Sequence, residues 1–373
     1  MAPPSRSPSL LDRWRAFRNR CIADPRFQRG SALFPLTRRI ALGNARALFD
    51  VTAGFVYSQI LFACVKLDLF RRVGHEVLTL EEIAGRIGLS GEATERLVRA
   101  AATLRLMERR DDGRWGLGDL GAAMLGAPGV AEMVDHHAAL YDDLKDPVAL
   151  LKNRGGQVGA FWRYSRNEAA GELTPEKVAD YSALMAASQA TFVEDVLAAH
   201  PFGDHARIVD IGGGEGQFVR ALAKRFAELR LAVFDLPGVA ALARERFAAD
   251  GVGDRAEAIG GDFFADPIPE ADLHTLIRVC FDHDDGPCLK LLTRIREATP
   301  PGGALLVAET MAGTPGAEPV GDAYFGFYLL AMGSGRPRTA EELSNLLKQA
   351  GFSHVREART ARPMLVRMLV ARP

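Results

Sequence analysis

Three short apolar runs of this chain each end in or just before an acidic residue, and this spacing indicates a binding site for an adenosine-containing ligand. Asp235, at the end of the second run, follows a glycine-rich turn by about 20 residues, where an acid accepts both hydroxyls of a ribose. After the third run, Asp262 suits the amino group of adenine and Phe263 suits its face. Glycines in the turn let a ligand approach the backbone closely. The residues expected to bind it are Asp210, Gly212, Gly214, Asp235, Asp262 and Phe263.

Two classes of cofactor compete for these strand ends, a dinucleotide and S-adenosylmethionine. The dinucleotide fingerprint has glycine at its first, third and sixth positions, but the sixth position counted from Gly212 is Gln217. The carboxylate of Asp210, just before the turn, would repel a pyrophosphate, whereas it suits a zwitterionic aminoacyl group beside a sulfonium. The pattern therefore favours S-adenosylmethionine as the cofactor, and it predicts no metal site.

The order of these segments predicts the elements that position them. A strand, the glycine-rich turn, a helix and a second strand succeed one another over 207–235, as in a doubly wound, Rossmann-like α/β domain. We place this cofactor-binding domain at 201–373. Residues 126–200 have a largely helical pattern, and we expect a connector with substrate-covering helices there. A chain of 373 residues leaves room for at least one further domain before it.

A helical, winged-helix domain is predicted at 45–125. Thr79 and Glu82 form a capping box for a short helix, and Asp112-Gly113 makes a tight turn between two short strands. A winged helix can bind DNA, but Glu92 and a second acid stand at the start of the candidate recognition helix, where they would repel phosphate. The prediction is therefore a dimerisation module in a homodimer, with no nucleic-acid partner.

The composition excludes several classes of protein. Apolar residues make up 48% and charged residues 25% of the chain, which is ordinary for a globular protein and excludes disordered and fibrous classes. A net charge of −1 argues against a globally basic nucleic-acid binder. The four cysteines are scattered and match no zinc spacing, so we expect reduced thiols and a cytoplasmic protein. The longest uncharged run, 51–65, is shorter than a membrane span and predicts a helix that is buried, either in a core or at a subunit interface.

An arginine-rich arm is predicted at 1–44. Residues 1–46 contain ten arginines and two acids, and Leu10, Trp14 and Phe17 fall at helical spacing among them. A basic amphipathic helix of this kind can lie on an anionic membrane surface, which would make the protein peripheral to a membrane. An arm that packs on a partner subunit and a transit peptide are the alternatives.

The chain also resembles the plant-type small-molecule O-methyltransferases, from about residue 45 to its C-terminus. The resemblance rests on the segments 209–216, Phe-Asp-Leu-Pro at 234–237, Gly-Gly-Asp-Phe-Phe at 260–264, 301–309 and 350–352. It implies the same cofactor contacts at 212, 235, 262 and 263, and we add Arg278 to them. It also implies that Met185 and Ser188 lie in a helix that covers cofactor and acceptor.

The departures from the family pattern are informative. The family has Arg-Val-Leu-His-Asp-Trp with His as general base, whereas this chain has Phe281 at the base position and Pro337 in place of a second acid. Glu309 is retained. The variant segments 278–283 and 321–336 are similar to one subgroup, the 1-hydroxycarotenoid O-methyltransferases of photosynthetic bacteria. This similarity implies methylation of the tertiary 1-hydroxyl of a demethylspheroidene-like acyclic carotenoid in carotenoid biosynthesis.

Methylation of a tertiary alcohol still requires a proton acceptor as the new bond forms. The expected acceptors are His283, Asp282 and Glu309, and we expect the aromatic segment 324–332 to line an apolar substrate tunnel. The residues expected to contact the substrate are Met185, Ser188, Phe281, Tyr324, Phe327, Tyr328 and Met332. The alternatives are another apolar alcohol or phenol as acceptor, different chemistry with the same cofactor, and a winged-helix regulator that binds S-adenosylmethionine as an effector.

Overall fold

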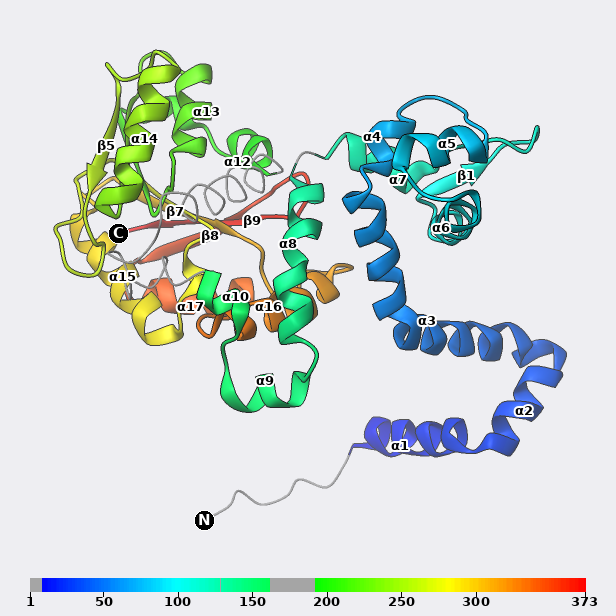
Figure 1. The fold of residues 1–373 in the computed structure, drawn as a ribbon. Coiled ribbons are helices and arrows are strands. Elements are labelled where there is room, and N and C mark those ends of the chain that lie inside the picture. Colours follow the sequence, from blue (N-terminus) through cyan, green and yellow to red (C-terminus); the bar gives the residue numbers. More distant parts are fainter. Residues whose placement is uncertain (1–8, 128, 162–191) are drawn as a thin grey trace. The chain divides into compact units, whose positions relative to one another are not determined.

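The computed structural model describes residues 9–127, 129–161 and 192–373, which fall into two compact units, Met1–Gly118 and Asp119–Pro373 (Figure 1). The division comes a few residues before the end of the predicted winged-helix domain. Each unit is described by itself below.

The first unit opens with three helices, α1 (Leu10–Ala23), α2 (Pro25–Leu33) and α3 (Pro35–Lys66). Among their described side chains only Cys64 is buried. The segment 51–65, expected to be a helix buried in a core or at a subunit interface, forms the second half of α3, where Val51 is 82% and Phe55 72% exposed. The first unit by itself therefore leaves much of this apolar segment exposed.

Helix α3 is long and apolar enough, by length and composition alone, to cross a membrane, and only 6% of its most apolar window is buried. The uncharged run 51–65 is too short to span a membrane, but an apolar membrane-spanning segment can also include one or two charged residues. The longer helix α3 therefore meets a criterion that the uncharged run alone does not. Helices that cover a core or a subunit interface pass the same test, so the composition of α3 does not identify its neighbour.

The rest of the first unit is a winged helix. It contains α4 (Leu69–Val73), α5 (Leu80–Ile87), α6 (Gly91–Thr103), β1 (Met107–Arg109) and β2 (Trp115–Leu117). The predicted capping box is present at the start of α5, where the Thr79 side chain accepts from the Glu82 N–H and the Glu82 side chain accepts from the Thr79 N–H. The strands β1 and β2 pair antiparallel around the predicted turn.

A seven-stranded sheet in the order β5-β4-β3-β6-β7-β9-β8 forms the centre of the second unit. The first five strands of this order run parallel, and β9 and β8 add an antiparallel edge. This is the predicted doubly wound arrangement. The strands are β3 (Arg207–Ile211), β4 (Arg230–Asp235), β5 (Ala256–Gly260), β6 (Leu273–Ile277), β7 (Ala304–Glu309), β8 (His354–Ala358) and β9 (Arg367–Arg372).

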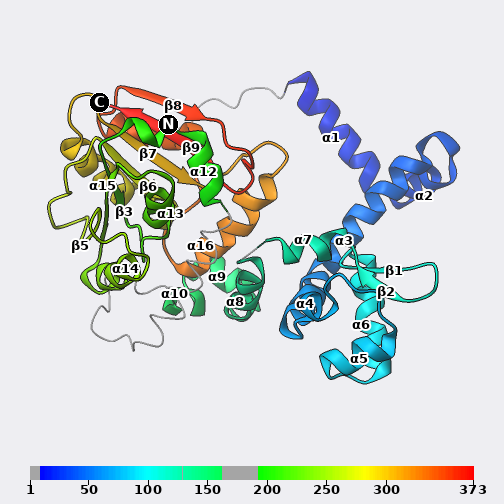
Figure 2. The ribbon, with the colours of Figure 1, turned by 90° about the horizontal axis from the view of Figure 1, so that it is seen from above.

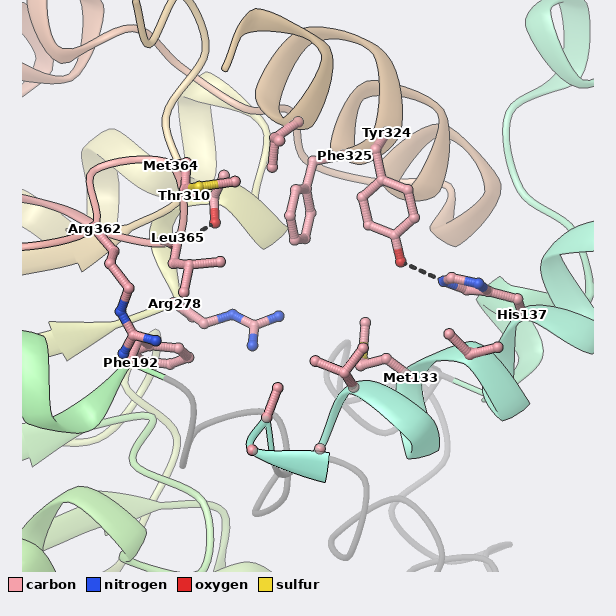
Figure 3. Close-up of a pocket in the computed structure, with 16 residues that line it drawn as sticks. Met133, His137, Phe192, Arg278, Thr310, Tyr324, Phe325, Arg362, Met364 and Leu365 are labelled. Atoms are coloured by element: carbon pink, nitrogen blue, oxygen red, sulfur yellow. Dashed lines mark hydrogen bonds between the residues drawn. The ribbon is translucent and has the colours of Figure 1, made fainter. Parts of the chain in front are cut away.

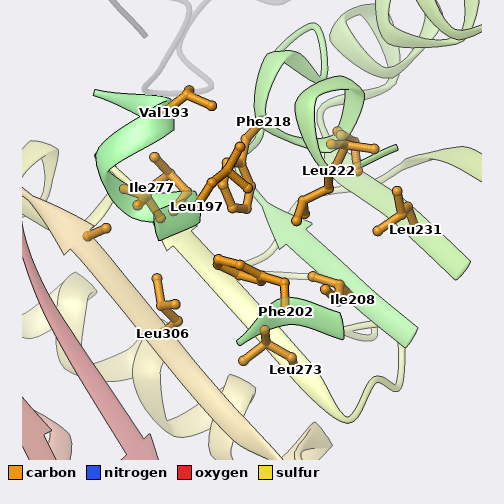
Figure 4. Close-up of a cluster of buried hydrophobic side chains, with 14 of the residues drawn as sticks. Val193, Leu197, Phe202, Ile208, Phe218, Leu222, Leu231, Leu273, Ile277 and Leu306 are labelled. Carbon is orange, nitrogen blue, oxygen red and sulfur yellow. The ribbon is translucent and has the colours of Figure 1, made fainter. Parts of the chain in front are cut away.

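Helices cover both faces of this sheet, so its central strands are buried on both sides. Successive residues point to opposite faces: Ile208 packs with Phe218 and Leu222 on one side, whereas Val209 packs on the other (Figure 4). The helices of the first side are α12 (Val193–Ala199), α13 (Gln217–Arg225) and α14 (Pro237–Ala249); those of the other are α15 (Asp285–Ala298) and α17 (Ala340–Gln349).

A separate group of helices gathers beside the sheet (Figure 2). It joins helices before the sheet in sequence with two that follow β7, and its apolar side chains form one cluster. The helices are α8 (Val130–Asp143), α9 (Pro147–Asn153), α10 (Gln157–Phe161), the π-helix η4 (Pro319–Phe325) and α16 (Gly326–Met332); α7 (Asp119–Leu125) precedes them.

Candidate active site

The sheet order reverses at β3, because the chain continues from β3 to β4 and β5 on one side and returns to β6 and β7 on the other. Ligands of doubly wound sheets bind at this switch point, outside the carboxyl ends of the strands. Apart from Arg278, which follows β6, the predicted cofactor residues lie at the carboxyl ends of β3, β4 and β5. Two of these ends are joined directly, since the Gly214 N–H donates to Asp235 Oδ2 over 2.8 Å.

Three of the four glycines of the turn have left-handed backbone angles, with φ of 69° at Gly212, 59° at Gly214 and 75° at Gly216. A Cβ at Gly212 would lie 2.9 Å from Val279, and one at Gly216 would lie 2.5 Å from the Phe247 ring. At Gly214, by contrast, a Cβ would meet nothing within 4 Å. Packing therefore requires glycine at 212 and 216, whereas the space beside the Cα of Gly214 is open to a ligand.

The acids at the ends of β3 and β4, Asp210 and Asp235, differ in what they contact. The carboxylate of Asp210 is 1% exposed and accepts from the Thr275 hydroxyl over 2.6 Å, and burial raises its pKa to about 7. Asp235 accepts from the backbone N–H groups of Gly214 and Leu236, and burial raises its pKa to about 6 despite them. Asp210 therefore supports the turn from the core, while Asp235 lies at the tip of β4.

An aromatic cluster lies next to the carboxyl end of β5 and the glycine turn. The Phe263 ring lies 3.7 Å from the position of a Cβ on Gly212, next to the turn. The His283 ring stands edge-on to Phe263 and Phe264, with centroid distances of 5.7 and 5.2 Å. Together with half-buried Asp262, these groups fit an adenosyl group: an apolar aromatic wall, a carboxylate and an open glycine turn.

This position bears on His283, an expected proton acceptor. Its ring lies among the residues that fit the adenosyl group, and it is absent from the lining of the cavity described below. Burial, and then Arg338, lower the pKa of His283 to about 4. Arg338 is fully buried and donates to the carbonyl oxygens of Cys280 and His283, so it fixes this segment. No local sequence signal revealed that anchor.

Beside this region the second unit contains a mostly apolar cavity of about 380 Å³ (Figure 3). Its volume lies within the range of small-molecule sites. Five side chains bring polar atoms to it: His137, Arg278, Thr310, Tyr324 and Arg362. The remaining lining residues are Gly126, Ala127, Gly129, Val130, Met133, Val134, Phe192, Val320, Phe325, Met364 and Leu365.

Arg278 was expected at the cofactor, but the structure places its guanidinium in this cavity (Figure 3). It lies over the rings of Phe192, Phe281 and Phe325, at 5.4, 5.6 and 6.0 Å from their centroids. Its backbone is left-handed, with φ of 59°, which costs free energy in a non-glycine residue and is common at functional sites. The cavity therefore holds a positive charge against aromatic faces.

Two histidine–tyrosine pairs, which the sequence did not indicate, join α8 to η4 and α16. His137 Nε2 lies 2.7 Å from the hydroxyl of Tyr324, and both residues line the cavity. One position away, His136 Nε2 lies 2.9 Å from the hydroxyl of Tyr328, and neither of these two residues lines it. Burial lowers the pKa of both histidines, that of His136 to about 4.

The other two expected proton acceptors, Asp282 and Glu309, lie next to Phe281 at the family's base position. Glu309 is fully buried; its Oε2 accepts from the Phe281 N–H over 3.1 Å and its Oε1 has no partner among the described residues. Burial raises the pKa of Glu309 to about 8 and that of Asp282 to about 7, although Arg278 opposes the second shift. Neither carboxyl lines the cavity.

The expected substrate residues divide into four groups. Tyr324 lines the cavity. Phe281, Tyr328 and Met332 are buried in the adjoining apolar cluster. Phe327 is 36% exposed, and Met185 and Ser188 lie outside the described residues.

Comparison with known proteins identifies both units. A family model described as the O-methyltransferase domain matches residues 141–353, and one described as the O-methyltransferase dimerisation domain matches 49–127. The chain is 39% identical over 373 residues to demethylspheroidene O-methyltransferase of Cereibacter sphaeroides, covering 100% of this chain and 97% of that protein. It is 40% identical over 342 residues to the enzyme of the same name from Rhodobacter capsulatus, covering 90% and 84%.

Among solved structures, human N-acetylserotonin methyltransferase in complex with S-adenosylmethionine has a similar fold. Its TM-score is 0.71 at 25% sequence identity, and the match covers 88% of this chain and 97% of that one.

Proposed function

The chain belongs to the O-methyltransferase family, and on that premise we propose that it methylates the tertiary 1-hydroxyl of a demethylspheroidene-like carotenoid. The enzyme is an S-adenosylmethionine-dependent O-methyltransferase and, through its dimerisation domain, a homodimer. We choose this substrate because the chain is about 40% identical to two demethylspheroidene O-methyltransferases.

The cavity supports this choice by its chemistry. Its walls are largely apolar, as an acyclic polyene end requires, and an arginine side chain lies among aromatic rings in it. At the family's base position, Phe281 offers an aromatic face in place of an imidazole. An imidazole at this position would take up the proton of a phenol, whereas a phenylalanine makes apolar contact with an aliphatic substrate chain.

The proposed reaction requires two regions of the second unit, one that binds the cofactor and one that binds the acceptor. Asp235, Asp262, Phe263 and the glycine turn would hold S-adenosylmethionine, which supplies an electrophilic methyl group on a sulfonium when bound. The cavity would hold the acceptor and exclude water from it. Alignment of the acceptor oxygen with the methyl group then supplies much of the rate enhancement in an in-line displacement.

Initial-rate measurements with isotope-labelled S-adenosylmethionine test this proposal. We expect kcat/KM for a 1-hydroxycarotenoid to exceed that for a phenol such as N-acetylserotonin by about 100-fold or more, because the substrate site is apolar and lacks the usual base. A carotenoid with its 1-hydroxyl already methylated serves as the control and should accept no label. Methylation of the phenol without methylation of the carotenoid would overturn the assignment.

For the dimer, we propose that a second copy covers the apolar half of α3. Residues 49–66 of this helix belong to the dimerisation domain, and Val51 and Phe55 are among its exposed apolar side chains. An exposed apolar face of this kind is typical of a subunit interface.

For the arm, we propose peripheral contact with an anionic membrane, in a protein that is otherwise cytoplasmic. In α1, Leu10, Trp14 and Phe17 are between 56% and 83% exposed and recur at helical spacing. Arg13, Arg15, Arg18 and Arg20 lie on the same helix. Apolar insertion together with basic side chains favours an anionic lipid surface.

Co-sedimentation with vesicles tests the membrane contact. The full chain should bind phosphatidylglycerol vesicles, and it should bind phosphatidylcholine vesicles much more weakly. Replacing the four α1 arginines by glutamine should release the protein from the anionic vesicles, since each basic side chain contributes about 1 kcal/mol near such a surface. Equal binding of the variant would contradict the proposal.

A further inference from the structure

We propose that Tyr324 and His137 form the proton relay of this enzyme: the acceptor hydroxyl donates to Tyr324 Oη, and His137 Nε2 takes up the tyrosine proton. The inference rests on the proposed function, because it concerns an alcohol that needs a proton acceptor in the substrate cavity. It assigns to α8 and η4 the task that the family's histidine performs at the position occupied here by Phe281.

The geometry of the pair suits this task. His137 Nε2 and Tyr324 Oη are 2.7 Å apart, a short distance for a hydrogen bond of this type, and both side chains line the cavity (Figure 3). When the imidazole carries its proton on Nδ1, Nε2 accepts from the tyrosine hydroxyl, and the lone pairs of Oη remain available to a substrate.

The π-helix η4 places Tyr324 at the cavity. Val320, Tyr324 and Phe325 of this helix all line it. π-Helical turns are rare and are frequently found at functional sites. Helix α8 presents Met133 and His137, one turn apart, to the same space.

The surroundings keep the relay uncharged at rest. Burial lowers the pKa of His137 from its ordinary 6.5, so its imidazole is neutral at pH 7. The groups that face the pair are His136 and Tyr141 on α8, Tyr328 on α16 and Arg278 beyond β6. Burial raises the pKa of Tyr324, while the Arg278 cation opposes the rise and would stabilise negative charge on the oxygens.

The step balances without another reactant. The acceptor oxygen forms a bond to the methyl carbon as the methyl–sulfur bond breaks, and the electron pair of that bond stays on sulfur. The acceptor O–H proton moves to Tyr324 Oη, and the tyrosine proton moves to His137 Nε2. The products are the methyl ether, the neutral thioether and an imidazolium, which later loses its proton to water.

The other candidates fit this task less well. His283 packs among the rings of the adenosyl region, and Glu309 is fully buried with its Oε2 occupied by the Phe281 N–H. Neither side chain lines the cavity, whereas Tyr324 and His137 both do.

The adjacent pair supplies a matched control. His136 and Tyr328 make the same type of hydrogen bond, at 2.9 Å, but do not line the cavity. His137→Gln keeps an oxygen that accepts from Tyr324 but cannot take up its proton. His136→Gln makes the same chemical change outside the cavity.

Turnover and its pH profile form the first test. His137→Gln should lower kcat by about 100-fold or more, and His136→Gln should leave it within about threefold of the wild type. The wild-type kcat should fall on the acid side of pH 6.5 as His137 becomes protonated, and His137→Gln should lose this limb. A His137→Gln variant with near-native kcat and an unchanged acid limb would overturn the relay.

Binding of the carotenoid without cofactor gives a second test that does not depend on turnover. The alcohol donates to Tyr324 Oη, so the wild type should bind the alcohol about threefold to tenfold more tightly than its methyl ether, as followed by polyene absorbance. Tyr324→Phe should lose this preference and lower kcat by about 100-fold. A Tyr324→Phe variant that keeps both the preference for the alcohol and a near-native kcat would overturn the relay, even if His137→Gln failed to fold.

The outcomes also separate this inference from the proposed function. If the wild type methylates the hydroxycarotenoid and both cavity variants remain active, the relay is wrong and the substrate assignment stands. If the wild type methylates only a phenol, the substrate assignment is wrong, and the same variants assayed on that phenol still decide the relay.

Discussion

Replacing Glu309 by glutamine should remove a large pH dependence from the stability of the methyltransferase unit. The carboxyl is fully buried, its Oε1 has no partner among the described residues, and burial raises its pKa to about 8. Its ordinary pKa, that of the unfolded chain, is 4.5. Between these two values the folded state binds a proton that the unfolded state has released, so stability falls as the pH rises.

The magnitude follows from the same two values. One pKa unit corresponds to about 1.4 kcal/mol, so raising the pH from 5 to 8 should remove about 3.5 kcal/mol of unfolding free energy through Glu309 alone. Glutamine has nearly the same shape and is neutral throughout. Glu309→Gln should therefore gain about that much stability relative to the wild type over this interval.

Urea denaturation followed by circular dichroism at several pH values between 5 and 8 measures this difference. Asp210, Asp235 and Asp282 also have raised pKa values and contribute with the same sign, but they cancel when the variant is compared with the wild type. Glu245→Gln, on the exposed surface of α14, controls for the loss of one negative charge. A difference between wild type and Glu309→Gln that stays constant across this pH range would refute the reasoning.

Three further predictions concern the strand ends. Asp235→Ala should abolish S-adenosylmethionine binding in calorimetry while the fold persists, and near-native affinity would contradict the ribose assignment. Gly216→Ala should cost about 2 to 4 kcal/mol in urea denaturation, because its Cβ would lie 2.5 Å from the Phe247 ring and φ is 75°; an unchanged midpoint would count against it. Phe281→His should bond the free oxygen of Glu309, raising kcat/KM for a phenol and lowering it for the carotenoid; unchanged selectivity would show that residue 281 does not set the acceptor class.

The strand-end residues were predictable because each follows a local pattern. Apolar runs, the glycine turn and Asp235 all lie within one βαβ segment, and a continuous apolar run marks a strand that is buried on both faces of the sheet. The capping box of Thr79 and Glu82 is equally local, and the structure forms it as predicted.

The cavity could not be predicted in the same way. His137 meets Tyr324 across 187 residues of sequence, because α8 packs beside η4. A histidine on a helical pattern carries no sign of such a partner. The direction of His283 likewise depends on distant Arg338, which anchors its carbonyl oxygen. The sequence also did not show that the first unit by itself leaves much of the 51–65 segment exposed, because an apolar run has the same composition in a core and at an interface.

The identity of the methylated product tests the central claim most directly. Purified enzyme, isotope-labelled S-adenosylmethionine and a demethylspheroidene-type 1-hydroxycarotenoid should give a carotenoid whose single new methyl group lies on the tertiary 1-oxygen, as shown by mass spectrometry and nuclear magnetic resonance. A carotenoid that remains unlabelled while a phenol in the same mixture is methylated, or a label on carbon instead of oxygen, would contradict the account.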